Sequence, residues 1–255
     1  MTVRGARAGV RRVLTAAGAA ALLSVTATSC AGGPPTIAPS GVDGLEVPTP
    51  SADPHDFVEG VDNRWFPLEP GTVWTYRSTG DEGDRTEVVT VTDRTRTVQG
   101  VNTTGVRAVI AGDDGKVVEE TFDWYAQDVD GNVWHFGADT TAYHHGSRGP
   151  RRSWEAGVDG AEAGLVMAAR PRVGDGYAQE HAPGVAEDRA EVLSLTELRT
   201  VPLDEYDDLV QIEETSPLRP GVVERTYYAS GVGPVLEETV AGGSESTQLV
   251  SFSSG

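Results

Sequence analysis

The chain has 255 residues, a net charge of −19 at pH 7 and a single cysteine. This length allows one large domain or two small ones with a real core, and an apolar content of 38% argues against wholesale disorder. The acidic balance argues against nucleic-acid binding. One cysteine excludes an intramolecular disulfide framework and a cysteine-based zinc site.

Residues 1–29 are typical of a lipoprotein signal peptide. Four arginines and no acid precede an apolar stretch at residues 13–25, which is too short to span a bilayer as a helix. Small residues then lead to Cys30. We predict cleavage before Cys30 and anchoring to the extracytoplasmic face of the cell membrane through acyl chains on its thiol. An ordinary signal peptide is the alternative, and Arg11 with Arg12 leaves the general and twin-arginine export routes open.

Residues 30–60 carry many prolines and glycines, which predict a tether behind the lipidated Cys30. From about residue 61, threonine, valine and aromatic residues alternate with charged ones, which is the period-two pattern of strands. The Asp-Gly pairs at residues 114–115 and 130–131 predict hairpin turns. No stretch keeps a helical period.

The second half of the chain repeats the first at an offset of 103 residues. Residues 124–126 (Trp-Tyr-Ala) align with 227–229 (Tyr-Tyr-Ala), and Gly71 aligns with Gly174. We therefore predict an all-β fold, an internally duplicated antiparallel β-meander that forms a sandwich or one curved, barrel-like sheet. The copies are expected at residues 61–143 and 173–255, with a linking segment at 144–172.

Several enzyme motifs are missing from the sequence. Lys116 is the only lysine and follows a turn, which argues against a Schiff-base or phosphate-loop lysine. Gly-x-Ser-x-Gly and His-Glu-x-x-His do not occur. Residues 128–132 (Asp-Val-Asp-Gly-Asn) resemble the start of a calcium loop, but they run straight into a strand, so we favour a tight turn. We predict no cofactor and no metal site.

Aromatic residues crowd the first half and supply the candidate binding residues. On alternating strands Phe122 shares a face with Trp124, and Trp134 shares a face with Phe136. Such a wall can hold an apolar or glycan ligand, and it can equally form the core of a leucine-poor β domain. The paired acids, such as Glu237 and Glu238, are expected to be solvated charge. The candidate ligand-binding residues are Trp124, Tyr125, Trp134, Phe136, Trp154 and Glu155.

Four motifs together are similar to those of an uncharacterised family of secreted or lipid-anchored bacterial proteins of unknown function, most of them actinobacterial. They are residues 71–76 (Gly-Thr-Val-Trp-Thr-Tyr), 123–134 (from Asp-Trp-Tyr-Ala to Asn-Val-Trp), 153–157 (Ser-Trp-Glu-Ala-Gly) and 226–233 (from Thr-Tyr-Tyr-Ala to Gly-Val-Gly). The resemblance covers about residues 60–253. It implies an extracytoplasmic β domain and supplies no catalytic residues.

Three functions follow as alternatives. The first is a lipid-anchored envelope protein with a binding or accessory role, whose partner is an apolar or glycan ligand or another protein. The second is a hydrolase of cell-wall or extracellular material that uses Glu155, Asp159 and Glu162, and the third is a purely structural role. A hydrolase needs such acids within hydrogen-bonding distance in a pocket, whereas a binder needs a concave apolar face. We expect binding rather than catalysis.

Overall fold

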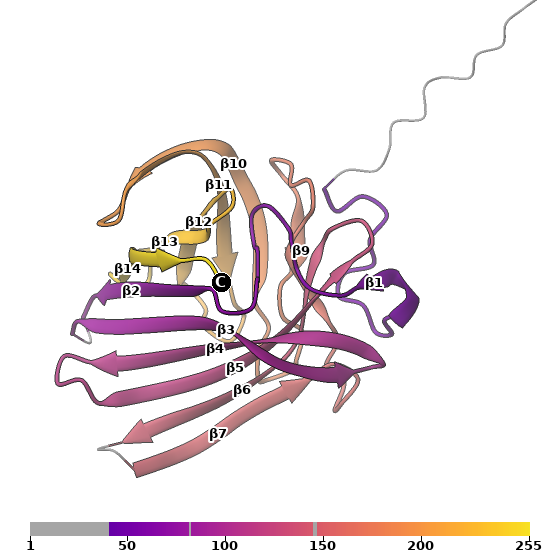
Figure 1. Cartoon of the computed structure of the whole chain (residues 1–255), viewed down its shortest axis with the longest axis horizontal. Coiled ribbons are helices and arrows are strands. Elements are labelled where there is room, and N and C mark those ends of the chain that lie inside the picture. Colours follow the sequence, from indigo (N-terminus) through magenta and orange to yellow (C-terminus); the bar gives the residue numbers. More distant parts are fainter. Residues whose placement is uncertain (1–40, 82, 145–146) are drawn as a thin grey trace, which may run out of the picture. The chain divides into compact units, whose positions relative to one another are not determined.

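Antiparallel strands form almost all of the regular structure (Figure 1). The computed structural model describes residues 41–81, 83–144 and 147–255, so Cys30 and the predicted signal peptide lie outside the described residues. Twelve strands follow one another along a single curved sheet that does not close on itself. The predicted all-β fold is confirmed, in its curved-sheet form. Within the described residues, regular helix is confined to a 3₁₀ turn, Pro54–Asp56.

The sheet consists of two six-stranded meanders. The first contains β2 (Val73–Thr79), β3 (Arg85–Val98), β4 (Val101–Gly112), β5 (Val117–Asp128), β6 (Val133–His144) and β7 (Ser147–Glu155). The second contains β9 (Gly176–Ala178), β10 (Arg189–Thr200), β11 (Glu205–Thr215), β12 (Val223–Ala229), β13 (Gly233–Ala241) and β14 (Ser246–Ser253). Strands β2 and β14 pair and join the meanders edge to edge. Two short strands lie off this path, β1 (Phe57–Val58) beside β5 and β8 (Gly164–Met167) beside β6.

The predicted duplication is confirmed strand for strand. The aligned aromatic motifs lie on β5 and β12, which are the fourth strands of their meanders. Arg96 lies over the Trp124 ring at 5.5 Å, and Arg199, 103 residues later, lies over the Tyr227 ring at 4.3 Å. The same side-chain contact is therefore present in both copies.

Each meander also begins with the same glycine turn. Gly71 has a φ of 94° and its N–H donates to the Val91 carbonyl at 2.9 Å. Gly174 has a φ of 90° and its N–H donates to the Val192 carbonyl at 2.8 Å. Only glycine adopts this backbone conformation at little cost, which explains why the two glycines align in the sequence.

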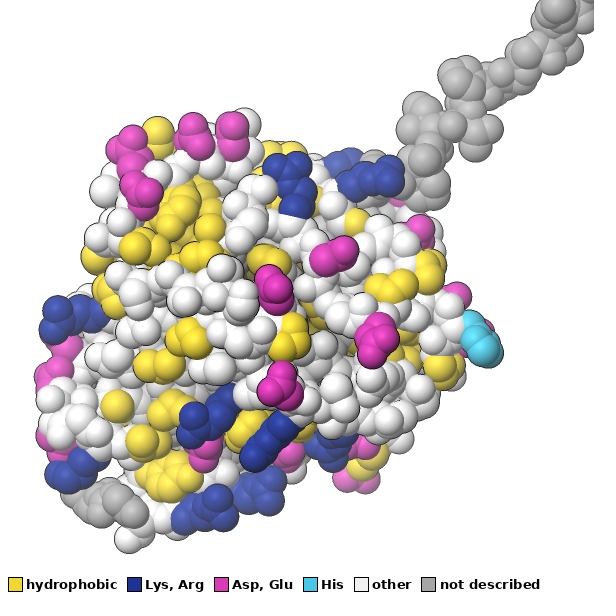
Figure 2. All heavy atoms as spheres, viewed as in Figure 1, with side chains coloured by type: hydrophobic (Ala, Val, Ile, Leu, Met, Phe, Trp, Pro, Cys, Tyr) yellow, Lys and Arg dark blue, Asp and Glu magenta, His cyan; other side chains and the backbone are white. Residues whose placement is uncertain are grey.

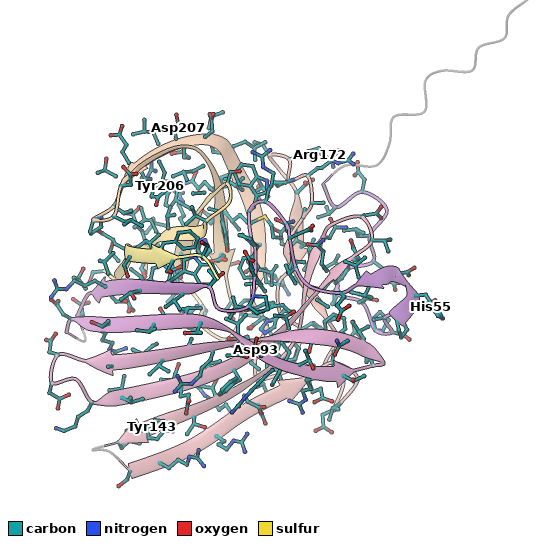
Figure 3. All side chains as sticks on the ribbon, viewed as in Figure 1. His55, Asp93, Tyr143, Arg172, Tyr206 and Asp207 are labelled. Carbon is teal, nitrogen blue, oxygen red and sulfur yellow. The ribbon has the colours of Figure 1, made fainter. Side chains whose placement is uncertain are left out.

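The boundaries of the parts differ from the expected ones. The first meander extends to Glu155, so β7 occupies the first half of the expected linking segment. Residues 41–60, expected to belong to the tether, pack on the sheet: the Thr49 N–H donates to the Ala163 carbonyl at 2.9 Å, and Phe57 packs on Phe136. Arg172, which Figure 3 labels, also pairs with Asp43 at 2.7 Å. A few apolar residues among the prolines pack against the core, and the average composition of this segment does not reveal them.

One large cluster of buried apolar side chains spans both meanders, and part of it fills the concave face of the sheet. Tyr227, Phe136, Leu165, Met167, Leu209, Ile212 and Leu249 are among its largest fully buried side chains. Because side chains alternate along a strand, Trp74 and Tyr76 on β2 share this face with Val89 on β3 and Val106 on β4. The two meanders curve toward each other here, so residues far apart in the sequence line one space.

Candidate functional site

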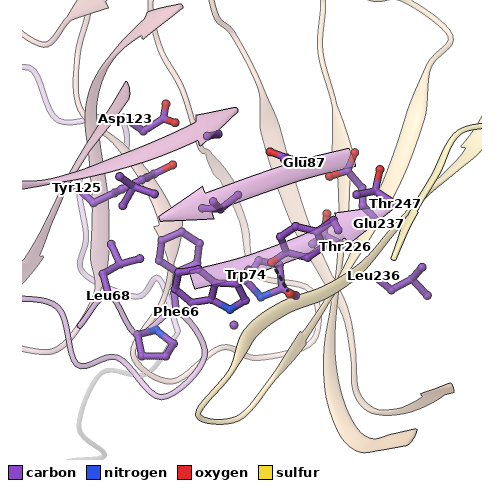
Figure 4. A pocket seen from close by; sticks show the side chains of 17 residues that line it. Phe66, Leu68, Trp74, Glu87, Asp123, Tyr125, Thr226, Leu236, Glu237 and Thr247 are labelled. Carbon is purple, nitrogen blue, oxygen red and sulfur yellow. Dashed lines mark hydrogen bonds between the residues drawn. The ribbon is translucent and has the colours of Figure 1, made fainter. Parts of the chain in front are cut away.

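A cavity of about 290 Å³ lies where the inner face of β2–β5 meets β12–β14 (Figure 4). Its apolar wall includes Phe66, Leu68, Trp74 and Val89. Phe66 precedes the first meander and packs between the aligned tyrosines of the two copies, 5.3 Å from the Tyr125 ring and 6.4 Å from the Tyr228 ring. The cavity therefore lies at the junction of the two repeats, which fixes its shape from both sides.

Three carboxylates also line the cavity, namely Glu87 on β3, Asp123 on β5 and Glu237 on β13. Figure 4 shows Glu87 and Glu237 at one end of the cavity, with Tyr125 and Leu68 toward the other. The described residues give neither glutamate a hydrogen bond or an ion pair. For the half-buried Glu87 this is unusual, because carboxylates close to a core are ordinarily paired, whereas Glu237 is exposed to water.

The surroundings of Glu87 oppose its ionisation. Burial is the main cause, and the charges of Asp123, Glu119 and Glu245 add to it, so that the pKa of Glu87 rises from 4.5 to about 7. Glu87 is consequently divided between its protonated and ionised forms at neutral pH.

The pKa of Glu237 is raised by the enclosing sheet and by the carboxylates of Glu214, Glu224 and Glu87. Its side chain is nevertheless exposed at the cavity, and contact with water weakens the effect of enclosure on its pKa. Both free glutamates of the cavity thus retain protons at a higher pH than ordinary carboxyl groups.

Asp123 differs from the two glutamates because it faces a buried histidine. His135 Nε2 lies 3.3 Å from Asp123 Oδ1, and Nδ1 lies 3.1 Å from Glu180 Oε1. Burial opposes a charge on His135, but the two carboxylates outweigh burial and raise its pKa to about 9. The imidazolium stacks on Tyr125 and meets the edge of Trp154. Asp123 therefore has a counter-charge.

Of the six predicted binding residues, Tyr125 lines this cavity and the other five lie elsewhere. Trp124 stacks with Phe122 on the opposite face of the sheet, where Arg96 covers the first ring and Arg94 the second. Figure 2 shows arginine and lysine side chains gathered over this part of the first meander. The two rings do share a face, as the alternation predicts, but that face is the outer one.

The remaining predicted residues have structural partners. Trp134 donates its indole N–H to Asp128 at 2.9 Å, and Phe136 is fully buried. Trp154 packs on His135, and Glu155 pairs with Arg96. Aromatic content pointed to these residues because aromatic side chains form cores as readily as binding walls.

The acids expected of a hydrolase do not converge in the cavity. Glu155 is held by Arg96, Asp159 occupies an exposed turn with a φ of 50°, and the Glu162 backbone pairs with His181. None of the three lines the cavity. Of the three acids that do line it, Glu87 and Asp123 were not among the candidate residues, and Glu237 was expected to be solvated charge. The alternation of side chains along β3 could have identified Glu87, because it lies two residues from Val89 and therefore on the same inward face.

Residues 128–132 form a hairpin turn. Asp128 is buried, and its carboxylate accepts hydrogen bonds from the backbone of Asp130 and from both the backbone and the side chain of Asn132, in addition to the Trp134 indole. Its oxygens are thus occupied by N–H donors. Across residues 41–81, 83–144 and 147–255, no group of three or more histidine, cysteine or acidic residues is placed to hold a metal ion.

No protein-family model matches this chain, and no curated protein does. Two solved structures are similar to it. One, from Parabacteroides distasonis, is described as a "putative lipoprotein", with 13% identity, a TM-score of 0.38, and 75% of this chain and 99% of that chain covered. The other, from Bacteroides fragilis, is described as a "putative exported protein with YmcC-like fold", with 10% identity, a TM-score of 0.39 and the same coverage. Likenesses at this level support no functional assignment.

The part of the chain that the structure describes contains no helix long and apolar enough to cross a membrane. The resemblance to an uncharacterised, mostly actinobacterial family, which rests on sequence motifs, stays a prediction.

Proposed function

We propose that this protein is a lipid-anchored binding protein at the extracytoplasmic face of the cell membrane, and that it holds a small ligand in the cavity between its two repeats. The observation that carries the proposal is the cavity itself, which has a largely apolar wall and free polar groups at one end, as ligand sites do. The basic, apolar and small-residue segments that end at Cys30 support the location.

The lipid anchor is tested by growing cells with an alkyne-bearing fatty acid. The wild-type protein should become labelled, and Cys30→Ser should not, because the acylated thiol is lost. Ser29→Ala changes a small residue next to the same position and should keep the label. Equal labelling of wild type and Cys30→Ser would contradict the anchor at this residue.

The binding role is tested by native mass spectrometry of the protein extracted from its own membrane. We expect an additional mass that is lost on denaturation. Ala108→Phe, which fills the cavity, should abolish it, whereas Ala241→Phe at an exposed position of β13 should keep it. A bare polypeptide mass in all three proteins would favour the structural role over binding.

A further inference from the structure

We propose that the cavity selects ligands that carry a positive charge on an apolar body, of the class of aliphatic or aromatic amines, with the ammonium group between Glu87 and Glu237. This inference rests on the proposed function, that the cavity holds a small ligand, and adds the chemical class. Two independent features of the described residues support it: the hydrogen-bonding state of the lining groups and the charges around them.

The first feature is that most hydrogen-bond donors of the cavity are already used; among its lining hydroxyls and indole, only the Tyr125 hydroxyl has no hydrogen bond within the described residues. The Trp74 indole N–H donates to the Val232 carbonyl at 2.8 Å, and the Tyr76 hydroxyl donates to the Pro234 carbonyl at 2.9 Å. The Thr226 hydroxyl donates to Glu214 at 2.7 Å, and the Thr247 hydroxyl pairs with Ser78 at 2.8 Å. These residues therefore present apolar surface to a ligand, and the glutamates supply the free acceptors.

The second feature is the sign of the surrounding charge. The charged groups acting most strongly on Glu87 and Glu237 are all carboxylates: Asp123 and Glu119 from β5, Glu214 from β11, Glu224 from β12 and Glu245 from the turn before β14. From β2 the facing titratable group is Tyr76. The buried cation His135 is held by Asp123 and Glu180. An anionic ligand would be repelled, whereas an ammonium group would relieve the repulsion.

The aromatic wall suits the same ligand. The Trp74 and Phe66 rings line the same cavity as the glutamates, with Phe66 toward the Leu68 end (Figure 4), and aromatic faces attract a desolvated ammonium group as well as covering an apolar chain. Neutral apolar ligands would gain only the second of these contributions. The cavity is thus built to favour an apolar cation over a neutral molecule of equal shape.

Binding should release protons. Because the pKa of Glu87 is about 7, this group is mostly protonated at pH 6 and mostly ionised at pH 8. A cation stabilises the ionised form, so the ionisation of Glu87 alone should raise the affinity about tenfold between these pH values and release about one proton per ligand at pH 6. Glu237, whose pKa is also raised, should add to both effects. A neutral ligand should show neither effect.

The test compares three probes of nearly equal shape, phenylbutylamine, phenylbutanol and phenylbutanoate, by isothermal titration of the whole protein. We expect the amine to bind at least about tenfold more tightly than the alcohol, and the acid more weakly than the alcohol. Glu87→Gln and Glu237→Gln should weaken the amine and leave the alcohol unchanged. Glu238→Gln, next to the cavity residue but outside its lining, is the matched control.

The outcomes separate the two proposals. If the alcohol or the acid binds as tightly as the amine, the inference about charge is overturned while a binding cavity stands. If none of the three probes binds, and native mass spectrometry shows no difference in bound mass between wild type and Ala108→Phe, the proposed binding function itself is contradicted.

Discussion

The buried His135 makes the stability of this protein depend on pH in a predictable way. Its pKa of about 9, against 6.5 for an ordinary histidine, means that folding favours the imidazolium. At roughly 1.4 kcal/mol for each tenfold change, this difference corresponds to about 3 kcal/mol of the free energy of unfolding, which is the net of the attraction by Asp123 and Glu180 and the opposing burial. This contribution is complete below pH 6.5, and it is lost as the pH rises from 6.5 through 9.

The perturbation is His135→Gln, which keeps a polar side chain but removes the charge. The free energy of unfolding, from urea titrations followed by tryptophan fluorescence, should differ most from wild type at pH 6. The difference should shrink by up to about 3 kcal/mol by pH 10, leaving only the packing against Tyr125 and Trp154. Comparing variant with wild type cancels the loss of stability that ionisation of Glu87 causes between pH 4.5 and 7.

The exposed His55, which the structure places outside any ion pair among the described residues, provides the control. His55→Gln should change the free energy of unfolding by less than about 0.5 kcal/mol at every pH. A His135→Gln difference that stays constant from pH 6 to pH 10 would refute the reasoning, because it would mean that the native His135 carries no charge for the carboxylates to stabilise.

Two further predictions concern stability. Asp128→Ala should lower the free energy of unfolding by about 3 kcal/mol, because four N–H groups lose their acceptor, whereas Asp130→Ala at the exposed turn should cost less than about 0.5 kcal/mol. Gly174→Ala should cost about 1–2 kcal/mol because of its positive φ, and Gly176→Ala on β9 much less. Urea unfolding checks both pairs, and equal effects within either pair would contradict the argument.

The junction of the repeats also shows how duplication produces an asymmetric cavity. Tyr125 and Tyr228 are equivalent and both contact Phe66. Glu87, by contrast, aligns at the 103-residue offset with Ala190, which is buried on β10. The shape of the cavity therefore comes from the part of the sequence that the copies share, and its charge comes from a position at which they differ.

The sequence by itself determined the strands, the hairpin turns and the duplication. These features depend on local chemistry: side chains alternate with a period of two, Asp-Gly pairs fit tight turns, and Gly71 and Gly174 mark turns that need a positive φ. Each of these properties is readable within a few residues, which is why the aligned motifs fell on equivalent strands.

Only the tertiary structure decided which face of each strand is buried and which side chains come into contact across the concave side of the sheet. The bulge between Trp124 and Tyr125 shifts the register of β5 against β6, and the outer face places Trp124 under Arg96. The cavity depends on the pairing of β2 with β14 and on contacts such as that of Trp74 with Val232. Such contacts join residues more than a hundred positions apart, and their geometry follows from accumulated sheet twist and register, which no local pattern specifies.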